Sequence, residues 1–207
     1  MQLSMTENAA LEVIRAFVAI SVPTSLLREV GRVQRQLLEE IGGNTIRWTR
    51  PEQMHLTLRF LGNVERSRLE EIQNALTAAL VTVPPFRLTL EGIGCFPSSR
   101  KPNVIWVGLA GDLDVLQRVQ QSIGEEIAPF ASHCEERRFH PHLTLGRVKT
   151  RNARNLRVAG ALEKMQIKGL GNWTVDAVEL IQSKLSPQGS QYTRLSSVGL
   201  VRLNPAA

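Results

Sequence analysis

The sequence predicts an α+β fold in which a helix-then-strand unit occurs twice and gives two pseudosymmetric lobes. Three observations support this prediction. Three stretches have helical periodicity, short runs rich in β-branched residues alternate with them, and the tetrapeptide His-Leu-Thr-Leu occurs at 55–58 and again at 142–145. With 207 residues, 43% of them hydrophobic, the chain can bury one substantial core. We therefore expect a single bilobal domain over 1–207, with a loose tail at 1–10.

The three helices are predicted from apolar residues that recur at spacings of three and four, which place a stripe on one helix face. We expect helices over 23–41, 64–80 and 112–127. Pro23 suits a first helical turn, and Asn63 is a suitable N-cap for the second helix. Each apolar stripe is expected to face the core.

The strands are predicted from short runs of β-branched and aromatic residues bounded by turn residues. These runs lie at 13–20, 54–61, 85–93, 104–109, 142–148, 173–183 and 192–203. The basic segment 151–168 fits neither pattern well, and we interpret it as a mobile loop or a short helix. A helix precedes each copy of His-Leu-Thr-Leu, which is why two related lobes are expected.

The repeated tetrapeptide lies in two of the predicted strands, where side chains two positions apart share a face. In the first copy, the apolar face comprises Met54, Leu56, Leu58 and Phe60. His55, Thr57 and Arg59 then lie together on the opposite face. A row of imidazole, hydroxyl and guanidinium groups is typical of a polar cleft and not of a core.

The second copy repeats this alternation, with His142 and Thr144 on one face. Arg147 falls on the other face by strict alternation, but a bulge at Gly146 would turn it toward the side of His142. At ordinary residue frequencies a given tetrapeptide is expected at about one position in 10⁵. Two copies in one short chain therefore indicate a shared function and not a coincidence.

Two histidines that face each other across a cleft suit in-line displacement at phosphorus. A neutral imidazole takes a proton from the attacking oxygen, and a protonated imidazole gives one to the leaving oxygen. Hydroxyl and guanidinium groups hold the non-bridging phosphate oxygens, whose charge must be balanced in the transition state. His55 and His142 are thus the predicted catalytic residues, and the residues alone leave open which is the acid and which the base.

Other interpretations fit the sequence less well. A metal site can be drawn from His133, Cys134, His140 and His142, but their spacing matches no standard zinc pattern, and His140 is interpreted as a half-exposed strand residue. The sequence has no Lys-x-Asp-Gly stretch of a nucleotidyl-transferring ligase and no Gly-rich phosphate loop ending in Gly-Lys-Ser/Thr, so ATP is not implied. A non-catalytic RNA-binding module that uses the same cleft remains the alternative.

The composition agrees with a polyanionic partner. The chain has 25 Lys and Arg against 19 Asp and Glu, a net charge of +6 and a pI near 10.0, which favours binding to nucleic acid. The two cysteines, Cys95 and Cys134, fit a reducing compartment, and we expect a cytoplasmic protein. The first apolar run begins at Leu11, contains Arg15 and is too short to cross a bilayer, so no membrane association is expected.

With these motifs in view, the sequence resembles the two-histidine phosphoesterase superfamily, and within it the RNA 2′,3′-cyclic phosphodiesterases, also named 2′-5′ RNA ligases. The resemblance extends from about Val13 to Leu200. It rests on four stretches in the order of the family, "MHLTLRFLG", "IGCFPSSRKPNVIWVGL", "FHPHLTLGR" and "SKLSPQGSQYTRL".

The resemblance implies antiparallel sheets around a central cleft with helices outside, each lobe supplying one motif. It also implies hydrolysis of an RNA-terminal 2′,3′-cyclic phosphate to a 2′-phosphomonoester without a metal or cofactor, and reverse 2′-5′ ligation as a side activity. By this pattern His55 is the proton donor to the leaving oxygen and His142 is the base that activates water. The residues matched to phosphate and substrate binding are Thr57, Thr144, Arg147 and Tyr192. The implied partners are RNA ends with a cyclic phosphate, such as tRNA halves, and we expect a monomer.

Overall fold

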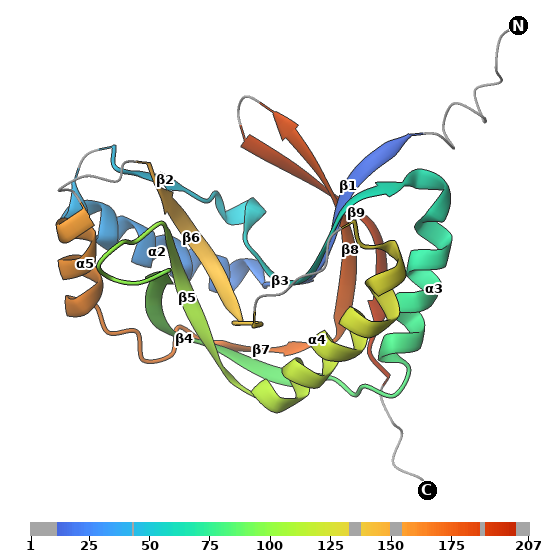
Figure 1. Cartoon of the computed structure of the whole chain (residues 1–207). Coiled ribbons are helices and arrows are strands. Elements are labelled where there is room, and N and C mark those ends of the chain that lie inside the picture. The colour runs from blue at the N-terminus through green and yellow to red at the C-terminus, as the bar shows by residue number, and fades with distance from the viewer. Residues whose placement is uncertain (1–11, 43, 133–137, 150–154, 187–188, 202–207) are drawn as a thin grey trace, which may run out of the picture.

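Figure 1 shows the computed structural model of the chain, in which two antiparallel sheets are flanked by helices. The structure describes residues 12–201 except 43, 133–137, 150–154 and 187–188. This arrangement confirms the predicted α+β class. The tail expected at 1–10 lies outside the described residues.

The first sheet contains β1 (Val13–Ser21), β3 (His55–Glu65), β8 (Ala177–Ser186) and β9 (Gly189–Gly199). Their order across the sheet is β3-β1-β8-β9, and neighbouring strands are antiparallel. Alternate side chains of β1 face opposite ways. Val18 and Ile20 are buried in the main core, whereas Phe17 and Ala19 form a small apolar cluster on the other face. The first His-Leu-Thr-Leu copy begins β3, at the edge of this sheet.

The second sheet contains β2 (Ile46–Trp48), β4 (Phe86–Phe96), β5 (Val104–Gly111), β6 (His142–Val148) and β7 (Asn172–Val175). Their order is β2-β6-β5-β4-β7, again antiparallel. The second His-Leu-Thr-Leu copy begins β6. Each sheet therefore carries one copy of the motif, as the predicted duplication requires.

The described helices are α2 (Thr24–Ile41), α3 (Leu69–Leu80), α4 (Leu113–Ile127) and α5 (Asn155–Lys164). The apolar stripe of α2 is buried, and the Gln34 side chain on its polar side donates hydrogen bonds to the carbonyls of Thr49 and Leu145. These bonds fix α2 beside β6. The hydroxyl of Ser122 on α4 donates to the carbonyl of Ala79 on α3, which joins these two helices beside the first sheet (Figure 1).

Several element boundaries differ from the sequence prediction. Asn63 is a strand residue and not an N-cap, because β3 stays paired with β1 as far as Glu65. The run 173–183 forms two strands, β7 and β8, which belong to different sheets. The short strand β2 was not predicted, because three residues give no measurable alternation. The segment 151–168 contains the helix α5, which agrees with the second of the two interpretations.

No helix in the described part of the chain has the length and apolar character needed to cross a membrane.

Candidate active site

The first histidine motif lies at the start of β3, and its register with β1 determines which side chains share a face. His55 pairs with Ser21, and Thr57 pairs with Ala19. Ala19 belongs to the small apolar cluster on the face opposite the main core. Because paired residues in an antiparallel ladder point the same way, His55 and Thr57 lie together on that face. We call it the site face of the first sheet.

The prediction that Arg59 lies on the site face is wrong, because β3 contains a bulge. The ladder shifts register so that Thr57 pairs with Ala19 while Arg59 pairs with Val18, which leaves Leu58 as the extra residue. Val18 is a core residue, so Arg59 lies on the core side of the sheet, where it is only 9% exposed.

Aromatic side chains from three strands lie on the site face, and two of them contact His55. Phe60 pairs with Phe17 and lies on the site face, not on the core face as predicted, and is 52% exposed. The ring of Phe17 stacks on His55 with the centroids 4.6 Å apart. The ring of Tyr192, on β9, meets the imidazole edge-on at 5.1 Å. Tyr192, which was selected from the sequence alone, is therefore in contact with the first histidine.

Burial lowers the pKa of His55 to about 4, because removal from water disfavours the charged imidazolium. A hydrogen bond with the backbone of Gln53 opposes this effect. Repulsion from a protonated His142 lowers the pKa further, and the Glu179 carboxylate raises it. The ring is consequently neutral at pH 7. His55 and His142 therefore lie near enough to each other for their charges to interact.

The second motif lies at the start of β6, and its histidine is held by the backbone. The Nδ1 atom of His142 lies 2.7 Å from the carbonyl oxygen of His140. Thr144 pairs with Trp106 of β5, so both lie on the face of His142. The ring centroids of Phe96 and Trp106 are 5.0 Å and 6.4 Å from that of His142. Each histidine thus has its own aromatic neighbours.

Burial also lowers the pKa of His142, while its hydrogen bond with the backbone of His140 opposes the shift. Electrostatic repulsion from His140 and from Arg147 lowers the pKa of His142 further. His140 is not the half-exposed strand residue that was predicted. It precedes β6, is exposed, and contributes its carbonyl to the second histidine. Each histidine is therefore hydrogen-bonded to the backbone two residues upstream, at Gln53 for His55 and at His140 for His142.

The bulge predicted near Gly146 is present. Thr144 pairs with Trp106 and Gly146 pairs with Ile105, so the ladder skips one residue between them. Arg147 then pairs with Val104 and lies on the face of Thr144. A Cβ atom at Gly146 would lie 2.6 Å from a methyl group of Ile46, so the close approach of β2 requires glycine here.

A buried carboxylate beside the first histidine was not predicted. Glu179 of β8 is 9% exposed, accepts a hydrogen bond of 2.6 Å from the Ser21 hydroxyl and pairs with Arg194 at 3.1 Å. Ser21 is the ladder partner of His55, so this network lies directly beside the imidazole. The only signal in the sequence is an acidic residue inside the apolar strand run that contains β8.

The alternative metal site finds no support in the described residues, in which no three His, Cys, Asp or Glu side chains form a group. Two of its proposed ligands, His133 and Cys134, lie outside those residues.

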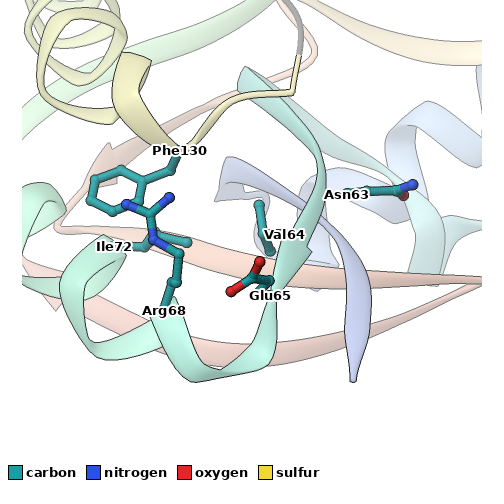
Figure 2. A pocket seen from close by; sticks show the side chains of 6 residues that line it. All are labelled: Asn63, Val64, Glu65, Arg68, Ile72 and Phe130. Atoms are coloured by element: carbon teal, nitrogen blue, oxygen red, sulfur yellow. The ribbon is translucent and has the colours of Figure 1, made fainter. Parts of the chain in front are cut away.

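A cavity of about 120 Å³, shown in Figure 2, is lined by Asn63, Val64, Glu65, Arg68, Ile72 and Phe130. The Arg68 guanidinium stands 4.5 Å from the centroid of the Phe130 ring. None of the residues predicted for the site lines this cavity.

The chain matches one protein-family model twice, over residues 20–106 and 107–192. The family is described as LigT-like phosphoesterase. Two successive matches to the same model agree with the duplication inferred from the repeated tetrapeptide.

Several named proteins resemble this chain over most of its length. The chain is 33% identical over 183 residues to an Archaeoglobus fulgidus protein named RNA 2′,3′-cyclic phosphodiesterase. The matched region covers 88% of this chain and 98% of the relative. The chain is 35% identical over 172 residues to an Aeropyrum pernix protein of the same name, covering 82% and 95%. The crystal structure of Escherichia coli LigT complexed with 3′-AMP superposes with a TM-score of 0.73 at 24% identity, covering 92% of this chain and all of that one.

A Thermus thermophilus structure gives the same TM-score of 0.73 at 23% identity and covers 90% of this chain and 98% of that one. At such low identity the two structures support the fold alone. The identity to the archaeal relatives and the family match over both halves also support membership of the family, because they include both histidine motifs. The chain belongs to the LigT-like phosphoesterase family.

Proposed function

We propose that this enzyme is an RNA 2′,3′-cyclic phosphodiesterase, which hydrolyses a terminal 2′,3′-cyclic phosphate to a 2′-phosphomonoester. Relatives of that name at 30–35% identity over most of the chain support the reaction class. The observation that carries the proposal is the pair of His-x-Thr motifs, one on each sheet, whose imidazoles interact and are each held by a backbone group two residues upstream.

In the proposed reaction, water attacks phosphorus in line with the bond to the 3′ oxygen. His142 accepts a proton from the water as the new P–O bond forms, and His55 donates a proton to the 3′ oxygen as the old bond breaks. The hydrogen bond to Nδ1 of His142 leaves Nε2 of the neutral ring as the acceptor that a base requires. After the reaction His142 is protonated and His55 is neutral. Both return to their starting states by exchanging a proton with solvent before the next turnover.

The charges beside the two rings support this division of roles. The Glu179 carboxylate favours a protonated His55, and the Arg147 guanidinium favours a neutral His142. Burial keeps both rings neutral in the free protein, and the negative charge of a bound phosphate raises the pKa of a nearby imidazole. We therefore propose that His55 gains its proton together with the substrate.

Thr57, Thr144 and Arg147 are the proposed ligands of the non-bridging phosphate oxygens. The register places each threonine on the face of its histidine, and within the described part of the chain neither threonine hydroxyl has a hydrogen-bond partner. Tyr192 lies against His55 and is the proposed contact to the ribose or phosphate on that side. Hydroxyl and guanidinium donors that are already oriented stabilise the charge of the transition state without a metal.

The test is product analysis after incubation with a nucleoside 2′,3′-cyclic phosphate. A 2′-phosphomonoester is expected, formed at the same rate with and without EDTA. A 3′-phosphomonoester would show that the 2′ oxygen leaves and would overturn the assignment of the leaving group. Binding without any turnover would support the alternative, a non-catalytic RNA-binding module.

We also propose a ligation activity, a class of RNA substrate, an oligomeric state and a location. The same site would join a 5′ hydroxyl to a cyclic phosphate end, with the 5′ oxygen attacking phosphorus in place of water and the 3′ oxygen leaving, which gives a 2′-5′ linkage. We propose RNA ends such as tRNA halves as substrates, a monomeric enzyme and a cytoplasmic location. The net charge of +6 supports the RNA substrate, and the small number of cysteines supports the location.

A further inference from the structure

Two arginines lie directly opposite each other on neighbouring strands of the second sheet. Arg47 on β2 pairs with Arg147 on β6, and both side chains are exposed. Paired residues point the same way, so Arg47 shares the face of Arg147, Thr144 and His142. The neighbours of Arg47 on β2 confirm this, because Ile46 and Trp48 lie where a Cβ of Gly146 would point, on the opposite face.

This arrangement is unfavourable without an anion. Like charges directly opposite each other in an antiparallel pair destabilise the sheet. Among the described residues, neither Arg47 nor Arg147 has an ion-pair or hydrogen-bond partner. Lys149, just past the end of β6, adds a third exposed cation, whose Nζ donates to the side chain of Asn44. The cations thus extend away from His142 along β6 and across to β2.

We propose that Arg47 and Lys149 bind a phosphodiester group of the RNA chain upstream of the cyclic end, while Arg147 serves the reacting phosphate, so that the preferred substrate is an oligonucleotide and not a free cyclic nucleotide. This inference rests on the proposed function. Guanidinium groups match the geometry of phosphate oxygens and bind them through paired hydrogen bonds.

The phosphodiester at Arg47 is distinct from the cyclic phosphate at His142, because the two positions are far apart along β6. Arg147 follows His142 by four strand steps once the bulged residue is removed, or roughly 13 Å along the strand, and Arg47 lies one strand farther from β5. The charge of Arg147 lowers the pKa of His142, whereas Arg47 does not contribute to that shift. A 2′,3′-cyclic phosphate is the last group at the 3′ end of an RNA, so every other phosphate of the substrate lies upstream. The anion that fits Arg47 is therefore one of those phosphodiesters.

The experiment compares two substrates with the same reactive end. Adenosine 2′,3′-cyclic phosphate has no upstream phosphate, whereas a short oligoribonucleotide that ends in adenosine 2′,3′-cyclic phosphate has several. The measured quantity is the ratio of kcat/KM for the oligonucleotide to that for the mononucleotide. We expect Arg47→Ala to lower this ratio by roughly tenfold at low salt, the loss typical of one charge-assisted hydrogen bond.

Salt dependence provides an independent measurement. For the wild-type enzyme, the logarithm of kcat/KM on the oligonucleotide should fall linearly with the logarithm of salt concentration between about 50 and about 200 mM. Loss of one phosphate contact to a single strand should reduce that slope by about 0.7 in the Arg47→Ala variant. Arg47→Lys keeps the charge and should retain most of the slope.

Arg118→Ala is the matched control, because it removes the same charge from an exposed arginine on α4, away from β2 (Figure 1). It should keep both the substrate ratio and the salt slope of the wild type. An Arg47→Ala variant with the ratio and slope of the control would overturn the proposal. Failure of the wild-type enzyme to hydrolyse either substrate would instead refute the proposed function, so the two failures are distinct.

Discussion

The Nδ1 atom of His142 lies 2.7 Å from the backbone carbonyl oxygen of His140, and His55 has the equivalent hydrogen bond with the backbone of Gln53. A neutral imidazole that donates from Nδ1 has its unshared pair on Nε2, so the carbonyl orients His142 and selects its tautomer. The orienting group is a main-chain atom. It therefore survives any substitution of the residue that supplies it.

This relationship gives the first prediction. Replacing either His55 or His142 by Ala should lower kcat by roughly 10²- to 10⁴-fold on a nucleoside 2′,3′-cyclic phosphate, because each loses a positioned acid or base. His140→Ala keeps the orienting carbonyl and should have a much smaller effect. Steady-state kinetics of the three variants would measure this difference, and near wild-type turnover by either His55→Ala or His142→Ala would refute the assignment.

The second prediction concerns the Glu179 carboxylate. Glu179→Gln removes a negative charge that favours the protonated form of His55, so the pKa of His55 in the enzyme–substrate complex should fall. Because the acid must be protonated, the basic limb of the kcat profile against pH should move to lower pH. Arg194→Gln removes the cation paired with Glu179 and should move that limb to higher pH. Identical profiles for the wild type and both variants would exclude an electrostatic role for Glu179.

The third prediction is a loss of stability in mild acid. The pKa of His55 is about 4 in the folded protein against 6.5 ordinarily, so the unfolded chain binds this proton more readily. The stabilising contribution is complete above about pH 6.5 and is lost as the pH falls to about 4, by up to about 3 kcal/mol. Urea unfolding at several pH values would measure the loss. His55→Gln should show a smaller loss, and an unchanged one would contradict the prediction.

The fourth prediction is that Arg47→Ala stabilises the protein. Removing one of two opposed guanidinium groups relieves repulsion between β2 and β6, and the expected gain in the free energy of unfolding is roughly 0.2 to 1 kcal/mol. Because salt screens exposed charges, the gain should shrink at high ionic strength. Thermal unfolding at low and high salt, with Arg118→Ala as the control, would measure both effects. A decrease in stability at low salt would show that the repulsion is already compensated.

The fifth prediction tests the bulge that turns Arg147. Gly146→Ala places a Cβ atom against the Ile46 methyl group, and overpacking of this kind costs about 1 to 3 kcal/mol. Activity should fall as well, because relief of the clash displaces β2 or the bulge. Gly124→Ala is the control, since no atom lies within 4 Å of its Cβ position on α4, and it should stabilise the helix by up to about 1 kcal/mol. Equal stabilities of the two variants would refute the steric requirement.

The face-sharing of the motif residues was predictable from the sequence, because alternation is reliable as long as a strand has no bulge. This is why the pairs His55 with Thr57 and His142 with Thr144 were placed correctly. The bulge of β6 was also predictable, since Gly146 indicated it. The bulge of β3 has no glycine to mark it, so alternation placed Arg59 on the wrong face.

The groups around the histidines were much less predictable, because they depend on contacts between distant strands. Ser21 and Glu179 are 158 residues apart in the sequence, and only the pairing of β1 with β8 brings them together beside His55. The ring of Phe17 likewise reaches the imidazole through the register of β1 with β3. No local pattern encodes such a register.

Asp176 separates β7, in the second sheet, from β8, in the first, so a single turn couples both sheets mechanically. The carbonyl of Asp176 accepts the backbone N–H of Leu200, which ties the residue after β9 to the same connection. The two sequence repeats consequently do not coincide with two independent folding units, since strands from both halves interleave in each sheet. We infer that the protein unfolds cooperatively, because each half expressed alone would lack strands of both sheets.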